Sequence, residues 1–254
     1  MDFECLLYTS QDQTAVITLN RPRVLNAMNR QLWRDMEQAL GLAAGDEEVS
    51  VVVFTGAGRA FSTGAHLKES QTRTADEYRA YLEGLQEVSR RIIRFPKPTI
   101  AAINGYALGS GYELALACDM RIAAHDAQIG SPEARVTSSV TGGAYRLLYD
   151  LVGPGKAAEL LFTAENIDGQ EAARIGLVNY AVPTGELMES ALALSAKIAA
   201  NSSFSMRVMK KGLLMARGGA GLDDLMDYEL EGCLACVSTS EREKSLEDFH
   251  SRKA

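Results

Sequence analysis

Two glutamates stand in local contexts that suit proton transfer. Glu113 occupies the first turn of an otherwise apolar segment, residues 110–118, that is expected to be helical. An acid at a helix start can simply complement the helix dipole, but burial beside a ligand would raise its pKa and suit it to acid–base catalysis. Glu133 follows Ser131 and Pro132 in a turn, where it could equally be solvated or cap the next segment. Taken singly, each glutamate is ambiguous.

Two glycine-rich turns could supply backbone donors beside these acids. Residues 51–68 and 99–116 each run from an apolar strand into small residues, at 64–65 and at 109–111. Small residues let a ligand approach the backbone closely, and two unpaired N–H groups aimed at one point would stabilise an oxyanion. Neither segment matches the glycine patterns of dinucleotide or triphosphate sites. By composition alone, such turns are more often structural.

The segments that must position these residues alternate between strand and helix. Apolar, β-branched runs predict strands at residues 15–20, 49–54, 99–103, 120–124 and 128–129. Helical spacing of apolar residues predicts helices at 30–44, 75–94 and 110–118. The run at 49–54 is apolar almost throughout, as in a strand buried on both faces. This succession predicts an α/β fold with largely parallel strand pairing.

The pattern changes near the C-terminus. From residue 184 onward, four helical segments follow one another with no strand between them, at 186–200, 204–217, 222–237 and 241–252. We therefore divide the chain into an α/β core, residues 1–200, and a C-terminal helical segment, residues 201–254.

Composition excludes several classes of protein. The net charge of −7 over 254 residues argues against a nucleic-acid partner, because phosphate binding needs a basic face. No apolar run is long enough to span a membrane, and the N-terminus does not resemble a signal peptide. Cys233 and Cys236 lack the further ligands of a zinc site. We expect a soluble, cytoplasmic protein with reduced cysteines and no metal.

Together these segments resemble the crotonase superfamily, the enoyl-CoA hydratase/isomerase family. The family pattern Ala-Phe-x-x-Gly-Ala-Asp-Leu-Lys corresponds to AFSTGAHLK at residues 60–68. The pattern Asn-Gly-x-Ala-x-Gly-Gly-Gly-x-Glu-Leu-Ala corresponds to NGYALGSGYELA at 104–115, and the Pro-Glu turn to SPE at 131–133. LNRP at 19–22, LNA at 25–27 and AARIGLV at 172–178 also match. Order and spacing are preserved along nearly the whole chain.

The resemblance implies a spiral of β-β-α turns followed by a C-terminal helical trimerisation segment, in a homotrimer or a homohexamer. It implies an oxyanion hole formed by the backbone N–H groups of Ala65 and Ser110. It also implies an acyl-CoA site that includes Arg23, Leu25, Ala27, Ala60, Ser62, Ala65, His66, Leu67, Lys68 and Gly109. Arg23 and Lys68 could contact the CoA phosphates or be ordinary surface charges.

Glu113 and Glu133 fall on the two positions that carry glutamate in hydratases of the family. Hydration of an enoyl-CoA needs one group to activate water and another to protonate C2, so two carboxylates can divide the work. By resemblance, Glu133 would protonate C2 and Glu113 would activate the water, without a metal or redox cofactor. An isomerase needs only one such carboxylate, so the pair favours hydration of an acyl-CoA substrate.

Three departures from the family pattern keep alternatives open. His66 replaces an aspartate, Ser110 replaces the middle glycine, and residues 139–147 lack the usual proline and include Tyr145. The last stretch borders the acyl site in relatives, so a substrate other than a short straight-chain enoyl group is plausible. An isomerase, an acyl-CoA hydrolase and a catalytically silent acyl-CoA-binding subunit remain alternatives, because one scaffold can host several reactions.

Overall fold

The computed structural model describes residues 3–65, 74–239, 242 and 246. His66, Leu67 and Lys68, and most of the helix expected at 241–252, lie outside these residues.

The larger sheet has six strands in the order β1-β2-β3-β5-β7-β9. The hairpin β1–β2 is antiparallel, and every other neighbouring pair is parallel, which confirms the expected pairing. The strands are β1 (Leu6–Gln11), β2 (Thr14–Leu19), β3 (Val51–Gly56), β5 (Thr99–Ile103), β7 (Met120–Ala124) and β9 (Tyr180–Val182). The sequence pattern indicated neither β1, whose side chains are mostly exposed, nor the three-residue β9.

A second, smaller sheet pairs β4 (Ala60–Ser62), β6 (Tyr106–Leu108) and β8 (Ile129–Gly130) in parallel. Each pair of consecutive strands, β3–β4, β5–β6 and β7–β8, places one strand in each sheet. The helices α3 (Ala75–Ile93), α4 (Ser110–Ala117) and α5 (Ala144–Thr163) follow these pairs in turn. This repetition is the spiral of β-β-α turns that the sequence motifs implied.

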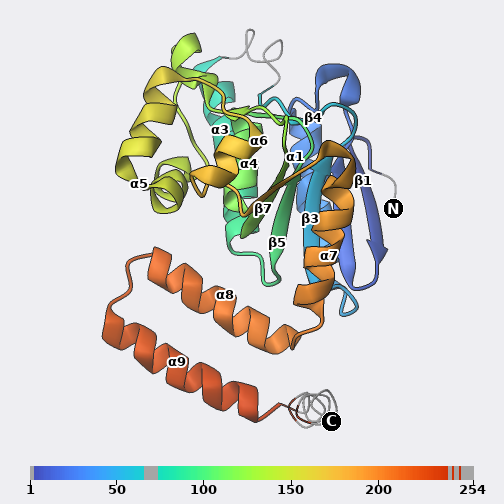
Figure 1. Ribbon diagram of the computed structural model, residues 1–254, viewed down its shortest axis with the longest axis vertical. Coiled ribbons are helices and arrows are strands. Elements are labelled where there is room, and N and C mark those ends of the chain that lie inside the picture. Colours follow the sequence, from blue (N-terminus) through green and yellow to red (C-terminus); the bar gives the residue numbers. More distant parts are fainter. Residues whose placement is uncertain (1–2, 66–73, 240–241, 243–245, 247–254) are drawn as a thin grey trace.

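Helices cover both faces of the larger sheet (Figure 1). On one face, α7 (Leu187–Ala199) packs against β3, β5 and β7, where Val51 and Val53 contribute to its apolar contact. On the other face, Val52 and Phe54 join the main core with α1 (Arg30–Gly45), α3 and α4. Successive side chains of a strand point to opposite faces. An all-apolar strand is therefore required at this position, as the sequence indicated.

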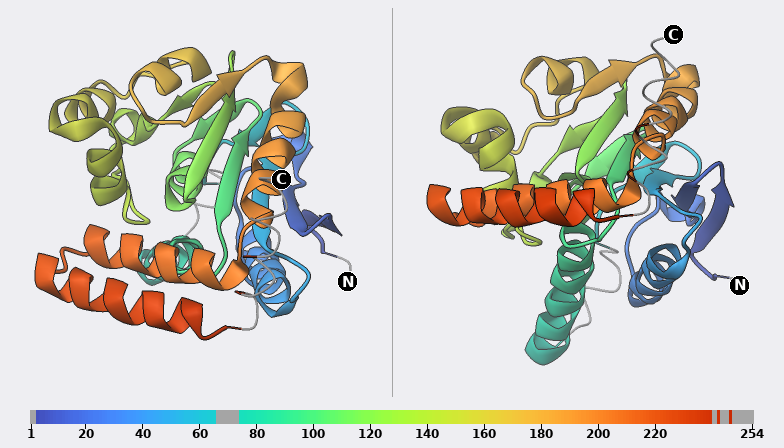
Figure 2. Two further views of the ribbon diagram at one scale, coloured as in Figure 1. Left: turned by 60° about the horizontal axis from the view of Figure 1, so that its bottom comes forward. Right: turned by 90° about the horizontal axis from the view of Figure 1, so that it is seen from below.

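The two helices α8 (Ser203–Arg217) and α9 (Leu222–Val237) form a hairpin that extends from one end of the core (Figures 1 and 2). A partly buried ion pair joins α8 to the core: Lys210 Nζ lies 2.6 Å from Asp119 Oδ2, and Lys210 also donates to the Lys97 carbonyl. Within the part of the chain that the structure describes, no helix is long and apolar enough to cross a membrane. All four cysteines are free thiols.

Candidate active site

The candidate site is built from the loops that follow the three strands of the small sheet. Residues 63–65 follow β4, Gly109 and α4 follow β6, and Ser131 with the 3-10 helix η2 (Pro132–Val136) follows β8. These strands are parallel, so their carboxyl ends meet at one edge of the sheet. The sheet therefore gathers Ala65, Ser110 and Glu133, which are far apart in the sequence.

The two glycine turns contact each other at this edge. Gly64 has a φ of +84°, and a Cβ on it would lie 2.8 Å from both the Leu108 carbonyl oxygen and the Ser110 nitrogen. Only glycine can therefore occupy position 64. Ser110 begins α4 and is 7% exposed, so its amide has no acceptor within the helix. The two residues expected to form the oxyanion hole thus come from adjoining turns.

Glu113 lies in the first turn of α4 and is only 2% exposed. Its Oε1 accepts a hydrogen bond from the Thr141 amide at 2.5 Å. Its Oε2 is buried and has no hydrogen-bond partner among the described residues. Burial raises the pKa of Glu113 from 4.5 to about 7; the Thr141 amide opposes the rise and the charge of Glu133 adds to it. The carboxyl can therefore exchange a proton near neutral pH.

Glu133 is half-buried in η2 and, like Gly64, lies close to Gly109. Its Oε2 accepts a hydrogen bond of 2.5 Å from the Ser131 hydroxyl. Its Oε1 lies 2.9 Å from the point that a Cβ on Gly109 would occupy. The negative charge of Glu133 also acts on Glu113. The structure thus places Glu133 beside the turn that carries Ser110, and Glu113 in the first turn of the helix that Ser110 begins.

The predicted CoA-binding segments, residues 21–27 and 60–65, lie side by side. Asn26 holds them together, because its Nδ2 donates to the carbonyls of Ala57 and Ala60 at 3.0 and 2.7 Å. The Ser62 hydroxyl donates back to the Asn26 carbonyl at 2.8 Å. The Leu25 carbonyl accepts from the Thr63 amide. Ala27 is buried beside this contact, whereas Arg23 is solvent-exposed in the 3-10 helix η1 (Pro22–Val24).

No local sequence pattern predicted that the Asn26 side chain would join these two segments. Asn26 is fully buried and has a φ of +55°, a conformation that asparagine tolerates better than most residues. Its position between two matching family residues was the one available signal, and nothing local indicated which carbonyls it would reach. Ser131 is likewise notable in the sequence only as part of the Pro-Glu turn.

The altered stretch after Glu133, residues 139–147, contacts the Glu113 carboxylate. Thr141 donates its amide to Glu113, and its hydroxyl accepts from Gln86 of α3 at 3.0 Å. The Tyr145 and Ser139 hydroxyls lie 2.6 Å apart, and Tyr145 is 62% exposed. The departures at 139–147 therefore contact the candidate site through Thr141, while Tyr145 lies at the surface.

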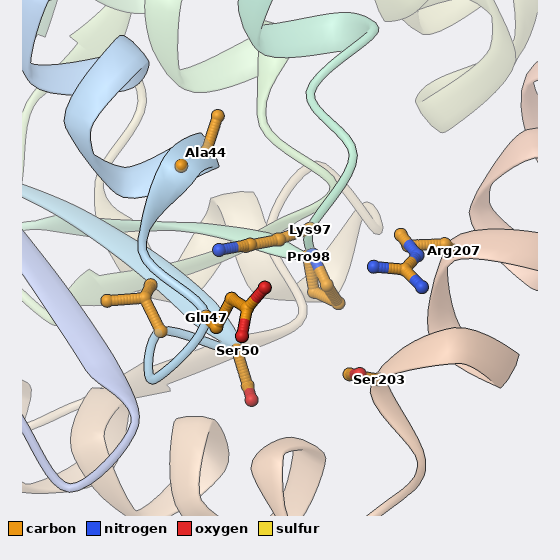
Figure 3. Close-up of a pocket in the computed structure, with 9 residues that line it drawn as sticks. Ala44, Glu47, Ser50, Lys97, Pro98, Ser203 and Arg207 are labelled. Carbon is orange, nitrogen blue, oxygen red and sulfur yellow. The ribbon is translucent and has the colours of Figure 1, made fainter. Parts of the chain in front are cut away.

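A separate hollow of about 470 Å³ lies at the opposite ends of the strands (Figure 3). Its lining comes from the residues that precede β3 and β5 and from the start of α8, and includes Glu47, Lys97, Ser203 and Arg207. Lys97 donates to the carbonyls of Ala43 and Asp46, both at 2.6 Å, so it caps the end of α1. In α/β folds, ligands bind beyond the carboxyl ends of the strands, which again favours the edge with the two glutamates.

Comparison with known proteins gives a consistent result. Residues 9–254 match the sequence profile of the family described as enoyl-CoA hydratase/isomerase. The chain is 36% identical over 251 residues to a short-chain-enoyl-CoA hydratase of Clostridium acetobutylicum, covering 98% of this chain and 95% of that protein. It is 34% identical over 258 residues to a crotonyl-CoA hydratase of Syntrophomonas wolfei, covering 100% of this chain and 98% of that protein.

The fold comparison agrees. The crystal structure of an enoyl-CoA hydratase from Bacillus anthracis superposes with a TM-score of 0.95 at 32% identity, covering 98% of this chain and 97% of the other. The resemblance that the sequence motifs carry is confirmed over almost the full length. This chain belongs to the enoyl-CoA hydratase/isomerase family, in the crotonase superfamily.

Proposed function

We propose that this protein is an enoyl-CoA hydratase, which adds water reversibly across the 2,3-double bond of an enoyl-CoA thioester. One observation carries the proposal: two carboxylates lie close enough for the charge of Glu133 to raise the pKa of the buried Glu113, and Glu133 Oε1 also lies 2.9 Å from the point that a Cβ on Gly109 would occupy. Two relatives over the full chain length are named as hydratases of short-chain enoyl-CoA and of crotonyl-CoA. The proposed substrate is an acyl-CoA thioester, and the proposed chemistry uses no metal or redox cofactor.

In the proposed mechanism, the thioester oxygen accepts hydrogen bonds from the amides of Ala65 and Ser110. Glu113 takes a proton from water through its unpaired Oε2, and the water oxygen bonds to C3. The electron pair of the double bond moves into the thioester, and the two amides stabilise the resulting enolate. Glu133 then delivers its proton to C2. A base whose pKa lies near 7 suits the first step at neutral pH.

Substitution of each carboxylate tests this proposal. Glu113→Gln and Glu133→Gln should each lower kcat by about 10²- to 10⁴-fold, because each removes one proton-transfer group. Affinity for a CoA thioester should stay nearly unchanged, because neither glutamate belongs to the proposed CoA-binding segments. The assay follows loss of the conjugated enoyl-thioester absorbance over a small panel of enoyl-CoA compounds.

The alternatives give different results in the same assay. Full activity of Glu133→Gln would contradict the two-carboxylate mechanism. Movement of a double bond without addition of water identifies an isomerase, and release of free CoA identifies a hydrolase. Binding of CoA thioesters without turnover of any enoyl-CoA identifies a silent binding subunit.

We also propose a homotrimer or homohexamer assembled through the α8–α9 hairpin. Its helices carry large apolar side chains that are more than half exposed in the single chain: Met209, Leu213, Leu222, Met226, Leu230 and Leu234. Contiguous exposed apolar surface of this kind is typical of a protein interface. The free cysteines support a reducing compartment, the cytoplasm, as the proposed location.

A further inference from the structure

We propose that Ser131 is a positioning residue for Glu133, fixing which of the two carboxylate oxygens faces the reacting carbon. The proposal deepens the hydratase function above and rests on it. Its starting observation is the hydrogen bond from the Ser131 hydroxyl to Glu133 Oε2, at 2.5 Å. This distance is at the short end of the range for hydrogen bonds between a hydroxyl donor and an oxygen acceptor.

The backbone around Ser131 makes this bond rigid. Ser131 follows β8 directly, and Pro132 occupies the first position of η2, where its ring restricts φ. Ser131 is only 3% exposed, so little solvent competes for its hydroxyl. The preceding residue, Gly130, ends β8, and its carbonyl accepts a hydrogen bond from the Gly109 amide at 3.2 Å. This bond joins the end of β8 to the neighbouring turn. The hydroxyl is therefore anchored to the same edge of the small sheet as the oxyanion turns.

The hydrogen bond from Ser131 makes the two carboxylate oxygens of Glu133 inequivalent. Oε2 is held by Ser131, and Oε1 is left facing Gly109, 2.9 Å from the position of a Cβ on that residue. A carboxylate without the Ser131 hydroxyl could rotate about its terminal bond, which is a soft torsion. In the proposed mechanism Oε1 then carries the proton to C2, because Oε1 is the oxygen beside the turn that holds the thioester.

The test is a double-mutant cycle between Ser131 and Glu133. Ser131→Ala should lower kcat about 10- to 100-fold, the loss expected when a proton donor is no longer held in position, with little change in KM. In the Glu133→Gln background the same substitution should have little further effect, because Ser131 acts through Glu133. Ser238→Ala, which removes an exposed hydroxyl at the end of α9, is the matched control.

Three outcomes overturn the proposal. An unchanged kcat in Ser131→Ala would show that the hydroxyl is dispensable. An equal loss of rate with and without Glu133 would show a merely structural role. If Ser131→Ala does not fold, Ser131→Thr and Ser131→Val provide the comparison, because they are nearly isosteric and only threonine keeps the hydroxyl; equal rates in these two variants count against the proposal. An inactive wild-type protein would instead contradict the hydratase function itself.

Discussion

Glu113 shows how one side chain acquires its chemistry from burial. Its neighbours along α4 are apolar and buried, so its carboxylate loses solvation, and the single amide of Thr141 compensates only in part. The result is a pKa of about 7 instead of the 4.5 of a solvated glutamate. The same burial that raises the pKa of Glu113 makes its ionised form costly to the folded state.

This cost predicts that stability depends on pH. The folded-state pKa of Glu113 lies above its unfolded value, so the folded chain binds more protons between about pH 4.5 and 7. The contribution of Glu113 to the free energy of unfolding therefore falls as pH rises through that window, by roughly 3 kcal/mol. Glu113→Gln keeps an acceptor for Thr141 but cannot ionise.

Urea unfolding at pH 5 and pH 8 measures the effect. The variant Glu113→Gln should gain stability relative to the wild type at pH 8 but not at pH 5. Glu189→Gln, on the first turn of α7, is a control at which no such pH-dependent gain is expected. A difference between wild type and Glu113→Gln that does not change with pH would contradict a raised pKa.

At the scale of elements, the small sheet positions the candidate site residues. Strands β4, β6 and β8 have only two or three residues each, yet each ends at a residue that leads into the site. Their parallel pairing stacks three loops at one edge, and the glycine turns permit closer contact than side chains would allow. Among these glycines, Gly109 lies closest to a proposed catalytic carboxylate, that of Glu133.

Gly109→Ala should inactivate the enzyme with moderate loss of stability. The new Cβ would lie 2.9 Å from Glu133 Oε1, and Gly109 has a φ of +54°; such backbone strain costs about 1–3 kcal/mol. The turn or the carboxylate must move, so kcat should fall at least about 10²-fold. Steady-state kinetics and thermal unfolding together check this prediction.

Gly155→Ala is the matched control for Gly109→Ala. Gly155 lies in α5 with nothing within 4 Å of a Cβ, so alanine there should leave activity unchanged and stability unchanged or higher by a few tenths to 1 kcal/mol. Wild-type kinetics in Gly109→Ala would show that the turn tolerates a side chain and that the contact with Glu133 is not required.

At the scale of the whole molecule, the core and the α8–α9 hairpin differ in what they bury. The core buries both faces of its sheet, whereas the hairpin packs closely along its own seam, where Gly232 lies against Val208, and leaves apolar side chains outside. The ion pair of Lys210 with Asp119 fixes the hairpin to the core. A hairpin held in place with its apolar surface uncovered is well suited to receive another copy of the chain.

We expect the purified protein to have three or six times the 27.5 kDa mass of one chain. Leu213→Asp combined with Leu230→Asp should lower this mass, because charges in an apolar interface lose solvation without gaining partners. Light scattering after size-exclusion chromatography measures the mass. Leu42→Asp, a partly exposed leucine on α1, is the control, and a wild-type monomer at micromolar concentration would contradict the proposed assembly.

Elements with clear apolar periodicity could be predicted from the sequence alone. The strand at 99–103 and the helix at 222–237 have the bounds that were expected, and the helix at 110–118 ends one residue earlier. Apolar patterning over several residues predicts such elements because it fixes which faces are buried. The motifs around residues 60–68, 104–115 and 131–133 also sufficed to indicate the family, since they constrain backbone turns that few residue types can form.

The contacts between the candidate residues could not be predicted from the sequence and are seen in the tertiary structure alone. The amide that binds Glu113 belongs to Thr141, 28 residues away, and the donor that joins residue 26 to residue 60 is an asparagine without any local pattern. The raised pKa of Glu113 depends on its burial, on the Thr141 amide and on the charge of Glu133, which come from different parts of the chain. Burial and long-range hydrogen bonds arise from packing between distant segments, so Glu113 and Glu133, each ambiguous in the sequence, become a pair only when three loops stack on the small sheet.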